Sequence, residues 1–184
     1  MKKRVITNEI ILDKALQYVI KNGIDSLNAR SLATEVNCST QPIYLSFKSM
    51  DDLKKQLLVN SKAFISSYIQ SRLHEYDTLF MGYLSAFIKF AYEYPKLYEF
   101  IYLKMAWENS EADQAYNDNI IKGIAKAGGY TYKIAEKFYI QSFIYAHGIA
   151  TQIATGYIKW DLDIINDLLE DEFIALKLKY KESE

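Results

Sequence analysis

Cysteine, proline and glycine are scarce in this sequence. The 184 residues include one cysteine, two prolines and seven glycines, while half of all residues are hydrophobic. One cysteine excludes an internal disulfide framework and is typical of a reducing compartment. Because helix breakers are few and apolar residues recur every three or four positions, we predict an all-α fold with a substantial hydrophobic core.

Motifs that carry catalysis are absent as well. The sequence contains no glycine-rich phosphate loop and no nucleophile elbow. Its two histidines, His74 and His147, lie far apart along the chain and form no metal-ligand pattern with Cys38. We therefore expect no enzyme activity, no metal and no cofactor.

One long segment has no formal charge. Residues 138–158, FYIQSFIYAHGIATQIATGYI, are uncharged over 21 residues, which is long enough to span a bilayer. Glutamine, serine, histidine and threonine are spread through it, which favours a helix that protein covers on several sides. The basic start of the chain resembles a signal peptide, but Glu9, Asp13 and Lys14 interrupt its apolar part. We expect a cytoplasmic protein that does not bind a membrane.

Charge is distributed unevenly along the chain. Residues 1–62 contain ten Lys and Arg against six Asp and Glu, a net charge of +4, whereas residues 63–184 contain twelve against seventeen, a net charge of −5. A basic N-terminal third on an acidic body indicates that this third contacts a polyanion. Many solvated surfaces differ by as much, so the asymmetry alone leaves both interpretations open.

Capping residues mark two helices at the start of the chain. Thr7 can cap a helix that runs to Asn22, where Gly23 supplies the left-handed stop. Asn28 can cap a second helix, and Asn37 can end it, because asparagine tolerates the left-handed conformation better than most residues.

A third helix follows at once and must be short. Ser39 can cap it, Pro42 lies in its first turn, and Ser49 begins a fourth helix that continues to about Tyr76. Further helices are expected at about 79–94, 96–108, 112–127, 132–157 and 161–180. No linker rich in proline, glycine or serine separates the halves, so we predict domains at 1–50 and 51–184, joined by the fourth helix.

The second and third helices together fit a helix-turn-helix. In that motif the second short helix enters the major groove of DNA. Gln41 can pair with adenine there, and Thr40 or Pro42 can touch a thymine methyl group. The residues predicted to contact DNA, including those that would hold phosphates, are Arg30, Ser39, Thr40, Gln41, Pro42, Tyr44 and Lys48. Short serine-capped helices also occur in many other helical proteins, which leaves a purely structural role open.

The segment from Ile11 to Leu53 resembles the DNA-binding domain of the TetR/AcrR family of bacterial transcriptional regulators. The similarity is carried by ILDKALQYVIKNG, then SLATEV before NCS, then QPIYLSF and KSMDDL. The family usually has glycine where Asn37 stands and often lysine where Met50 stands, so a phosphate contact at position 50 is in doubt. The resemblance implies a homodimer that binds a near-palindromic DNA operator and releases it when an unknown small-molecule effector binds a helical C-terminal domain.

Small residues in the uncharged segment support a homodimer. Ala146, Ala150 and Ala154 are spaced four apart, which permits close helix approach, and the last helix is rich in large apolar residues. Two such helices from each subunit would form a four-helix interface. The predicted interface residues are Ala146, Ala150, Ala154, Ile165, Leu169 and Phe173. The alternative is that both helices belong to the core of a monomer.

Aromatic residues are abundant, with 16 tyrosines, nine phenylalanines and two tryptophans. Several of them could line an apolar effector pocket with polar groups at its edge. The residues predicted for it are Phe80, Tyr83, Phe87, Tyr98, Tyr102, Trp107, Tyr139 and Phe143. Simple core packing is the alternative for each of them.

The favoured function is therefore a ligand-responsive transcriptional repressor. The alternative is a helical ligand-carrier or protein-interaction module without specific DNA binding, in which the basic third is incidental. A specific, salt-sensitive shift of operator DNA would separate the two.

Overall fold

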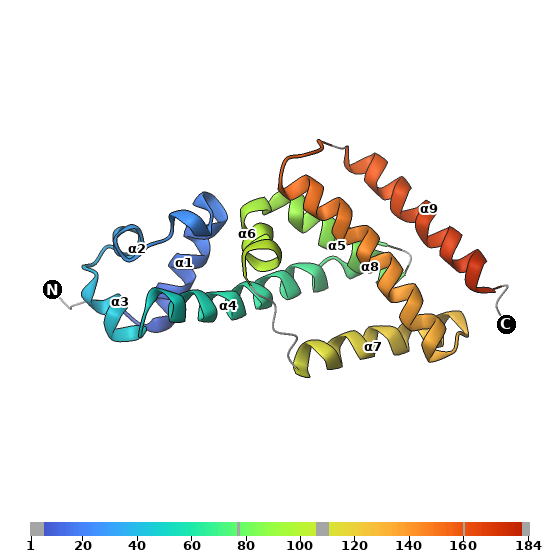
Figure 1. Cartoon of the computed structure of the whole chain (residues 1–184), viewed down its shortest axis with the longest axis horizontal. Coiled ribbons are helices and arrows are strands. Elements are labelled where there is room, and N and C mark those ends of the chain that lie inside the picture. Colours follow the sequence, from blue (N-terminus) through green and yellow to red (C-terminus); the bar gives the residue numbers. More distant parts are fainter. Residues whose placement is uncertain (1–5, 77, 106–110, 160, 182–184) are drawn as a thin grey trace. The chain divides into compact units, whose positions relative to one another are not determined.

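The computed structural model describes residues 6–76, 78–105, 111–159 and 161–181 (Figure 1). All the regular elements in these ranges are helical, which confirms the predicted all-α fold. The chain forms two compact units, one of residues 1–67 with 94–105 and the other of residues 68–93 with 106–184. The predicted functional boundary after residue 50 stays a prediction.

In the described residues, the first unit begins with three helices and most of a fourth. They are α1 (Asn8–Asn22), α2 (Ala29–Val36), α3 (Gln41–Ser46) and α4 (Met50–Gln70), with a 3-10 turn, η1 (Ile24–Ser26), after α1. Thr7 caps α1 by accepting the Ile10 N–H (3.4 Å), and Asn28 caps α2 in a reciprocal capping box with Ser31. Both predicted caps are confirmed.

The turn between α2 and α3 depends on Asn37. This residue has φ 59°, in the left-handed region, as predicted. The Asn37 N–H donates to Thr34 O (3.1 Å) and the Cys38 N–H donates to Ala33 O (2.9 Å), which together end α2 in a Schellman motif. The chain can therefore enter α3 after only four residues.

Apolar side chains from all four helices fill the interior of this unit. Leu32, Ile43 and Phe47 are almost completely buried, and so are Leu53 and Leu57 on α4. The short α3 is thus held by its inner face, since six residues are too few for an independent helix.

Residues 94–105 also belong to the first unit. A single helix over 96–108 was predicted, but the structure has α6 (Pro95–Glu99) followed by one π-helical turn, η3 (Phe100–Lys104). Leu97, Phe100 and Ile101 are completely buried, and α6 packs against α1.

In the part of the second unit that the structure describes there are four further helices and a short 3-10 turn. They are α5 (Leu79–Glu93), α7 (Glu111–Gly128), α8 (Tyr132–Ala154) and α9 (Leu162–Lys181), preceded by η2 (Leu73–Glu75). Helices α5, α7 and α9 all pack on α8. Gly82 permits a close approach of α5 to the backbone of η2, because a Cβ atom there would lie 2.5 Å from Leu73 O. None of the helices in the described part of the chain has an apolar stretch long enough to cross a bilayer.

Candidate nucleic-acid interface

Two buried anchors fix the orientation of α3. Ile43 and Phe47 are 1% and 2% exposed, and Phe47 ends the helix by donating its N–H to Ile43 O (2.9 Å). Thr40, and not Ser39, is the N-cap of α3, so the predicted serine cap is wrong. Thr40 O accepts the N–H groups of Ile43 and Tyr44 (3.2 and 3.3 Å), and Pro42 needs no such partner in the first turn.

The opposite side of α3 is open. Gln41, Tyr44 and Leu45 share it, because residues three and four apart lie on the same side of a helix. Tyr44 is 57% exposed and Leu45 is 80% exposed, and Gln41 is exposed as well. The side therefore offers an amide, a phenol and an aliphatic group together.

The remaining predicted DNA contacts surround this side. Arg30, Ser39 and Lys48 are exposed, whereas Thr40 and Pro42 are half-buried. Arg30 lies in the first turn of α2, and Lys48 lies in the turn between α3 and α4. The structure thus leaves five of the seven predicted side chains exposed, Tyr44 and Gln41 among them.

Leu45 was missed in the sequence analysis. Its signal was available, because it follows Gln41 by four positions and is out of phase with the buried pair Ile43 and Phe47. A leucine that contributes nothing to the core of the chain is suited to apolar contact with a partner, such as a thymine methyl group.

Hydrogen bonds order the backbone beside Lys48. Asp52 accepts the Lys48 N–H (2.9 Å), while Ser49 Oγ accepts the Asp52 N–H (3.1 Å) and so caps α4. The pKa of Asp52 lies below its usual value because Gln56 and the Lys48 N–H donate hydrogen bonds to the carboxylate. This carboxylate stays charged at neutral pH and keeps the turn closed.

The predicted effector-pocket residues are divided between the two units. Tyr98 and Tyr102 pack on each other in the first unit, with ring centroids 4.9 Å apart. Trp107 lies outside the described residues. The other five belong to α5 and α8 of the second unit; they are Phe80, Tyr83, Phe87, Tyr139 and Phe143.

Four of those rings form part of one aromatic cluster, and the fifth, Tyr83, lies beside it, 6.4 Å from the ring of Tyr116 on α7. Tyr139 lies 6.4 Å from Phe80 and 5.8 Å from Phe143, and Phe143 lies 5.6 Å from Phe87. His147 continues the series at 5.4 Å from Phe87. The rings contact one another here, and the role of this cluster as an effector pocket stays a prediction.

Burial favours the neutral forms of the polar groups of this cluster. Desolvation raises the pKa of Tyr139 to about 12, and its hydroxyl donates to Asn117 Oδ1 (2.9 Å). Desolvation also raises the pKa of Tyr83 and lowers that of His147. The cluster therefore presents uncharged hydrogen-bonding groups. Among the described residues, no group of three or more His, Cys, Asp and Glu is placed to hold a metal ion.

The predicted dimer residues are already packed within the single chain. Ala146 and Ala150 have no exposed surface, and Ile165 and Leu169 have at most 1%. Ala154 is also buried, while the half-buried Phe173 packs its ring against Phe80 and Phe138 at 6.4 and 5.5 Å. These side chains contact α5, α8 and α9 of their own chain, so the structure leaves them little surface for a second copy.

A different side of α8 is exposed. Ile140 is 46% and Ile144 is 65% exposed, and Gly148 and Thr155 are exposed on the same side. Nothing lies within 4 Å of a Cβ atom built at Gly148. We call these four residues the open side of α8. It has no formal charge, as the sequence of this segment requires.

Comparisons with known proteins identify the fold. No family model and no curated protein sequence matches the chain. Among solved structures, a protein of unknown function from Rhodococcus sp. RHA1 is similar over 97% of both chains, with a TM-score of 0.74 and 20% identity. A TetR-like transcriptional regulator from the same organism is similar over 100% of both chains, with a TM-score of 0.63 and 18% identity.

A third neighbour is the fatty acid degradation regulator FadR from Bacillus halodurans. It is similar over 96% of this chain and 97% of its own, with a TM-score of 0.63 and 18% identity. The chain therefore has the all-α fold of TetR-type regulators over its whole length, as the resemblance in residues 11–53 implied.

Proposed function

We propose that this protein is a ligand-responsive transcriptional repressor that binds a near-palindromic DNA operator as a homodimer. One observation carries the proposal: α3 buries Ile43 and Phe47 while leaving Gln41, Tyr44 and Leu45 exposed. A helix-turn-helix enters the major groove with such a side, and the fold shared with a TetR-like regulator supports the same role.

Each exposed group has a distinct part in the proposed complex. Gln41 pairs with adenine, and Leu45 contacts a thymine methyl group, so both read the sequence. Tyr44, Lys48 and Arg30 hold phosphates, which fixes the register without reading bases. Ser39, Thr40 and Pro42 complete the surface at the start of α3.

A gel-shift experiment with DNA from the protein's own promoter tests this function. We expect a specific shift whose affinity falls steeply with salt, because binding releases counterions from phosphates. The footprint should have two-fold symmetry, with half-sites about one helical turn apart or slightly more. The matched control is Val59→Ala, a change of an exposed apolar residue on α4 outside the proposed interface. A footprint without two-fold symmetry would contradict the dimer.

We assign the dimer interface to the open side of α8 and commit to a second copy of the chain as its partner. Ile140 and Ile144 would exclude water there, and Gly148 would allow the two backbones to approach closely. An uncharged helix side suits an identical uncharged side, since no like charges face each other across the two-fold axis. This assignment replaces the predicted set built on Ala146, Ala150 and Ala154.

The segment 94–105 provides a route by which an effector acts on DNA binding. Lys96 Nζ donates to Lys21 O (2.7 Å) at the end of α1. Lys104 forms ion pairs with Asp25 of η1 and with Glu99 (3.6 Å), and these carboxylates raise the pKa of Lys104. A ligand that displaces this segment would therefore displace the end of α1. Hydrogen exchange across residues 19–27 should increase in a Lys96→Gln, Lys104→Gln double variant.

A ligand-carrier or protein-interaction module remains the competing function. The aromatic cluster of α5 and α8 would serve a carrier as well as a repressor. The gel shift separates the two, because a carrier gives no sequence-specific complex and no change on Gln41→Ala.

A further inference from the structure

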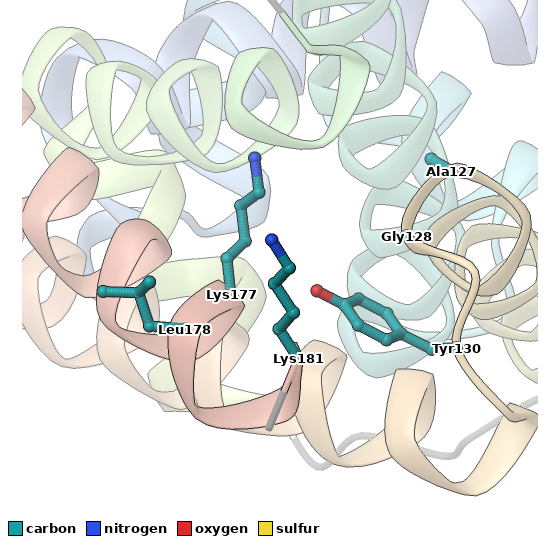
Figure 2. Close-up of a pocket in the computed structure, with 6 residues that line it drawn as sticks. All are labelled: Ala127, Gly128, Tyr130, Lys177, Leu178 and Lys181. Atoms are coloured by element: carbon teal, nitrogen blue, oxygen red, sulfur yellow. The ribbon is translucent and has the colours of Figure 1, made fainter. Parts of the chain in front are cut away.

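A cleft lies at the carboxyl ends of α7 and α9, within the second unit. Its volume is about 420 Å³, and it is lined by Ala127, Gly128, Tyr130, Lys177, Leu178 and Lys181. Figure 2 shows the ammonium groups of Lys177 and Lys181 and the phenol oxygen of Tyr130 directed into the same space. None of these residues belongs to the proposed DNA surface or the open side of α8, and Tyr130 reaches the aromatic cluster only through Phe138.

The structure holds Tyr130 in place beside the cleft. Gly129 has φ 72°, and the Tyr130 N–H donates to Ala125 O (3.0 Å), so the chain turns back at the end of α7. A Cβ atom at Gly128 would lie 2.2 Å from the Tyr130 ring, so the ring packs directly on this glycine. Its ring also stacks on that of Phe138, with centroids 6.1 Å apart and planes at 26°. The hydroxyl is therefore already positioned before any ligand binds.

The two lysines carry like charges on one side of α9. They are four residues apart, an arrangement that is destabilising on a helix surface. The ion pairs of the described residues involve other side chains, and Lys177 Nζ lies 5.5 Å from the centroid of the Phe173 ring. A negative charge between the two ammonium groups would offset their repulsion.

We propose that this cleft binds an organic anion. Its carboxylate or phosphate group would lie between Lys177, Lys181 and the Tyr130 hydroxyl, since ammonium groups and phenols both donate hydrogen bonds to such oxygens. Its apolar body would lie against Leu178 and Ala127. The cleft volume is within the range of about 300–1,000 Å³ typical of small-molecule sites. The site does not depend on whether the protein binds DNA.

Calorimetric titration of the full chain tests the proposal with four probes. Octanoate and octyl phosphate should each bind at one site per chain, and their relative affinity identifies the preferred head group. Octanol and inorganic phosphate should bind at least about tenfold more weakly, because octanol lacks the anionic head group and inorganic phosphate lacks the apolar body. Octanol binding as tightly as octanoate, inorganic phosphate binding as tightly as octyl phosphate, or no binding of either organic anion would overturn the proposal.

Variants locate the binding. Lys177→Gln and Lys181→Gln should each weaken octanoate binding about tenfold, and Tyr130→Phe should weaken it about threefold. Lys179→Gln is the matched control, because it removes the same charge from the opposite side of α9, where Lys179 lies over the Tyr180 ring at 5.3 Å. If Lys179→Gln weakened binding as much as the other two, the attraction would be diffuse and the assigned site would be wrong.

Discussion

The exposed side of α3 and the open side of α8 differ in charge and hydrogen-bonding capacity, although both present bulky apolar groups to solvent. Leu45 on α3 lies between Gln41 and Lys48, whereas Ile144 on α8 lies between Ile140 and Gly148. The first side has amide and ammonium donors and a positive charge that match a polyanion, whereas the four residues of the second carry no charge and a single hydroxyl, that of Thr155. Exposed apolar surface alone therefore does not identify the kind of partner. The charged and hydrogen-bonding groups around that surface identify it.

The largest effect is expected from a charge placed on α8. Ile144→Glu should raise the dimer dissociation constant by at least about 100-fold, because the carboxylate would be desolvated against its own copy. Sedimentation velocity at several concentrations measures this change. The matched control Val59→Glu alters another exposed apolar residue, 69% exposed on α4, and should leave the dimer intact. An Ile144→Glu protein that still sediments as a dimer would exclude the assigned interface.

The next largest effects concern phosphate contacts around α3. Tyr44→Ala should weaken binding to all DNA sequences by about tenfold or more, and Lys48→Gln should reduce the salt slope of log K by about one. Gel shifts at four salt concentrations give both values. A loss confined to the operator sequence would show that Tyr44 reads bases and does not merely hold the backbone.

Base reading is expected from Gln41 and Leu45. Each should contribute roughly 1–3 kcal/mol of discrimination at one base pair. Gln41→Ala should lower the ratio of specific to non-specific affinity, and an unchanged ratio would refute its role. For Leu45→Ala, replacement of the contacted thymine by uracil removes the same methyl contact. The two changes should therefore not be additive in a double-mutant cycle.

Gly148→Ala should change the stability of the folded chain and the affinity of the dimer in opposite directions. A methyl group replaces hydrogen where nothing lies within 4 Å, so the folding of the single chain should gain about 0.5–1 kcal/mol. The same methyl should weaken the dimer if two α8 helices approach there. Gly123→Ala on α7, which also has open space around it, should stabilise the fold without affecting the dimer. Equal behaviour of both variants in sedimentation would place the interface elsewhere.

The smallest effect concerns a carboxylate that α9 packs against α8. Desolvation raises the pKa of Glu172, and Ser142 donates to its carboxylate (3.3 Å). Because the folded pKa exceeds the unfolded value of 4.5, the stabilising contribution is fully present below that value and is lost as pH rises through the folded pKa. Glu172→Gln should flatten this part of the pH profile in urea unfolding between about pH 4 and 7. An unchanged profile would show that another group titrates there.

Local signals in the sequence identified the helix-turn-helix almost completely. Thr7, Asn28 and Asn37 act as caps and stops at the expected positions, because each satisfies backbone groups within four residues of itself. The boundary of α3 was missed by one residue, since Ser39 and Thr40 are equally suitable caps by type. Even the exposed side of α3 follows from helix periodicity once Ile43 and Phe47 are assigned to the core.

The sequence predicted the helices of the second unit, but not which sides of those helices are exposed. Small side chains at Ala146, Ala150 and Ala154 permit close approach of a neighbouring helix. Their spacing does not predict whether that helix belongs to the same chain or to a second copy. In the structure the neighbours are helices of the same chain, and the exposed side of α8 is instead that of Ile140 and Ile144. The aromatic set was also divided, because Tyr98 and Tyr102 belong to the first unit and the other described rings to the second.

The sequence by itself determined the helical class, the caps, the corner between α2 and α3 and the charge difference between its two parts, because all of these depend on residues close together in the chain. Only the tertiary structure decided which side of α8 faces solvent, where residues 94–105 pack, and that Tyr130, Lys177 and Lys181 border one cleft. Those features depend on contacts between residues far apart in sequence. Helical periodicity predicts which side of a helix is apolar, but it does not predict which other element packs against that side.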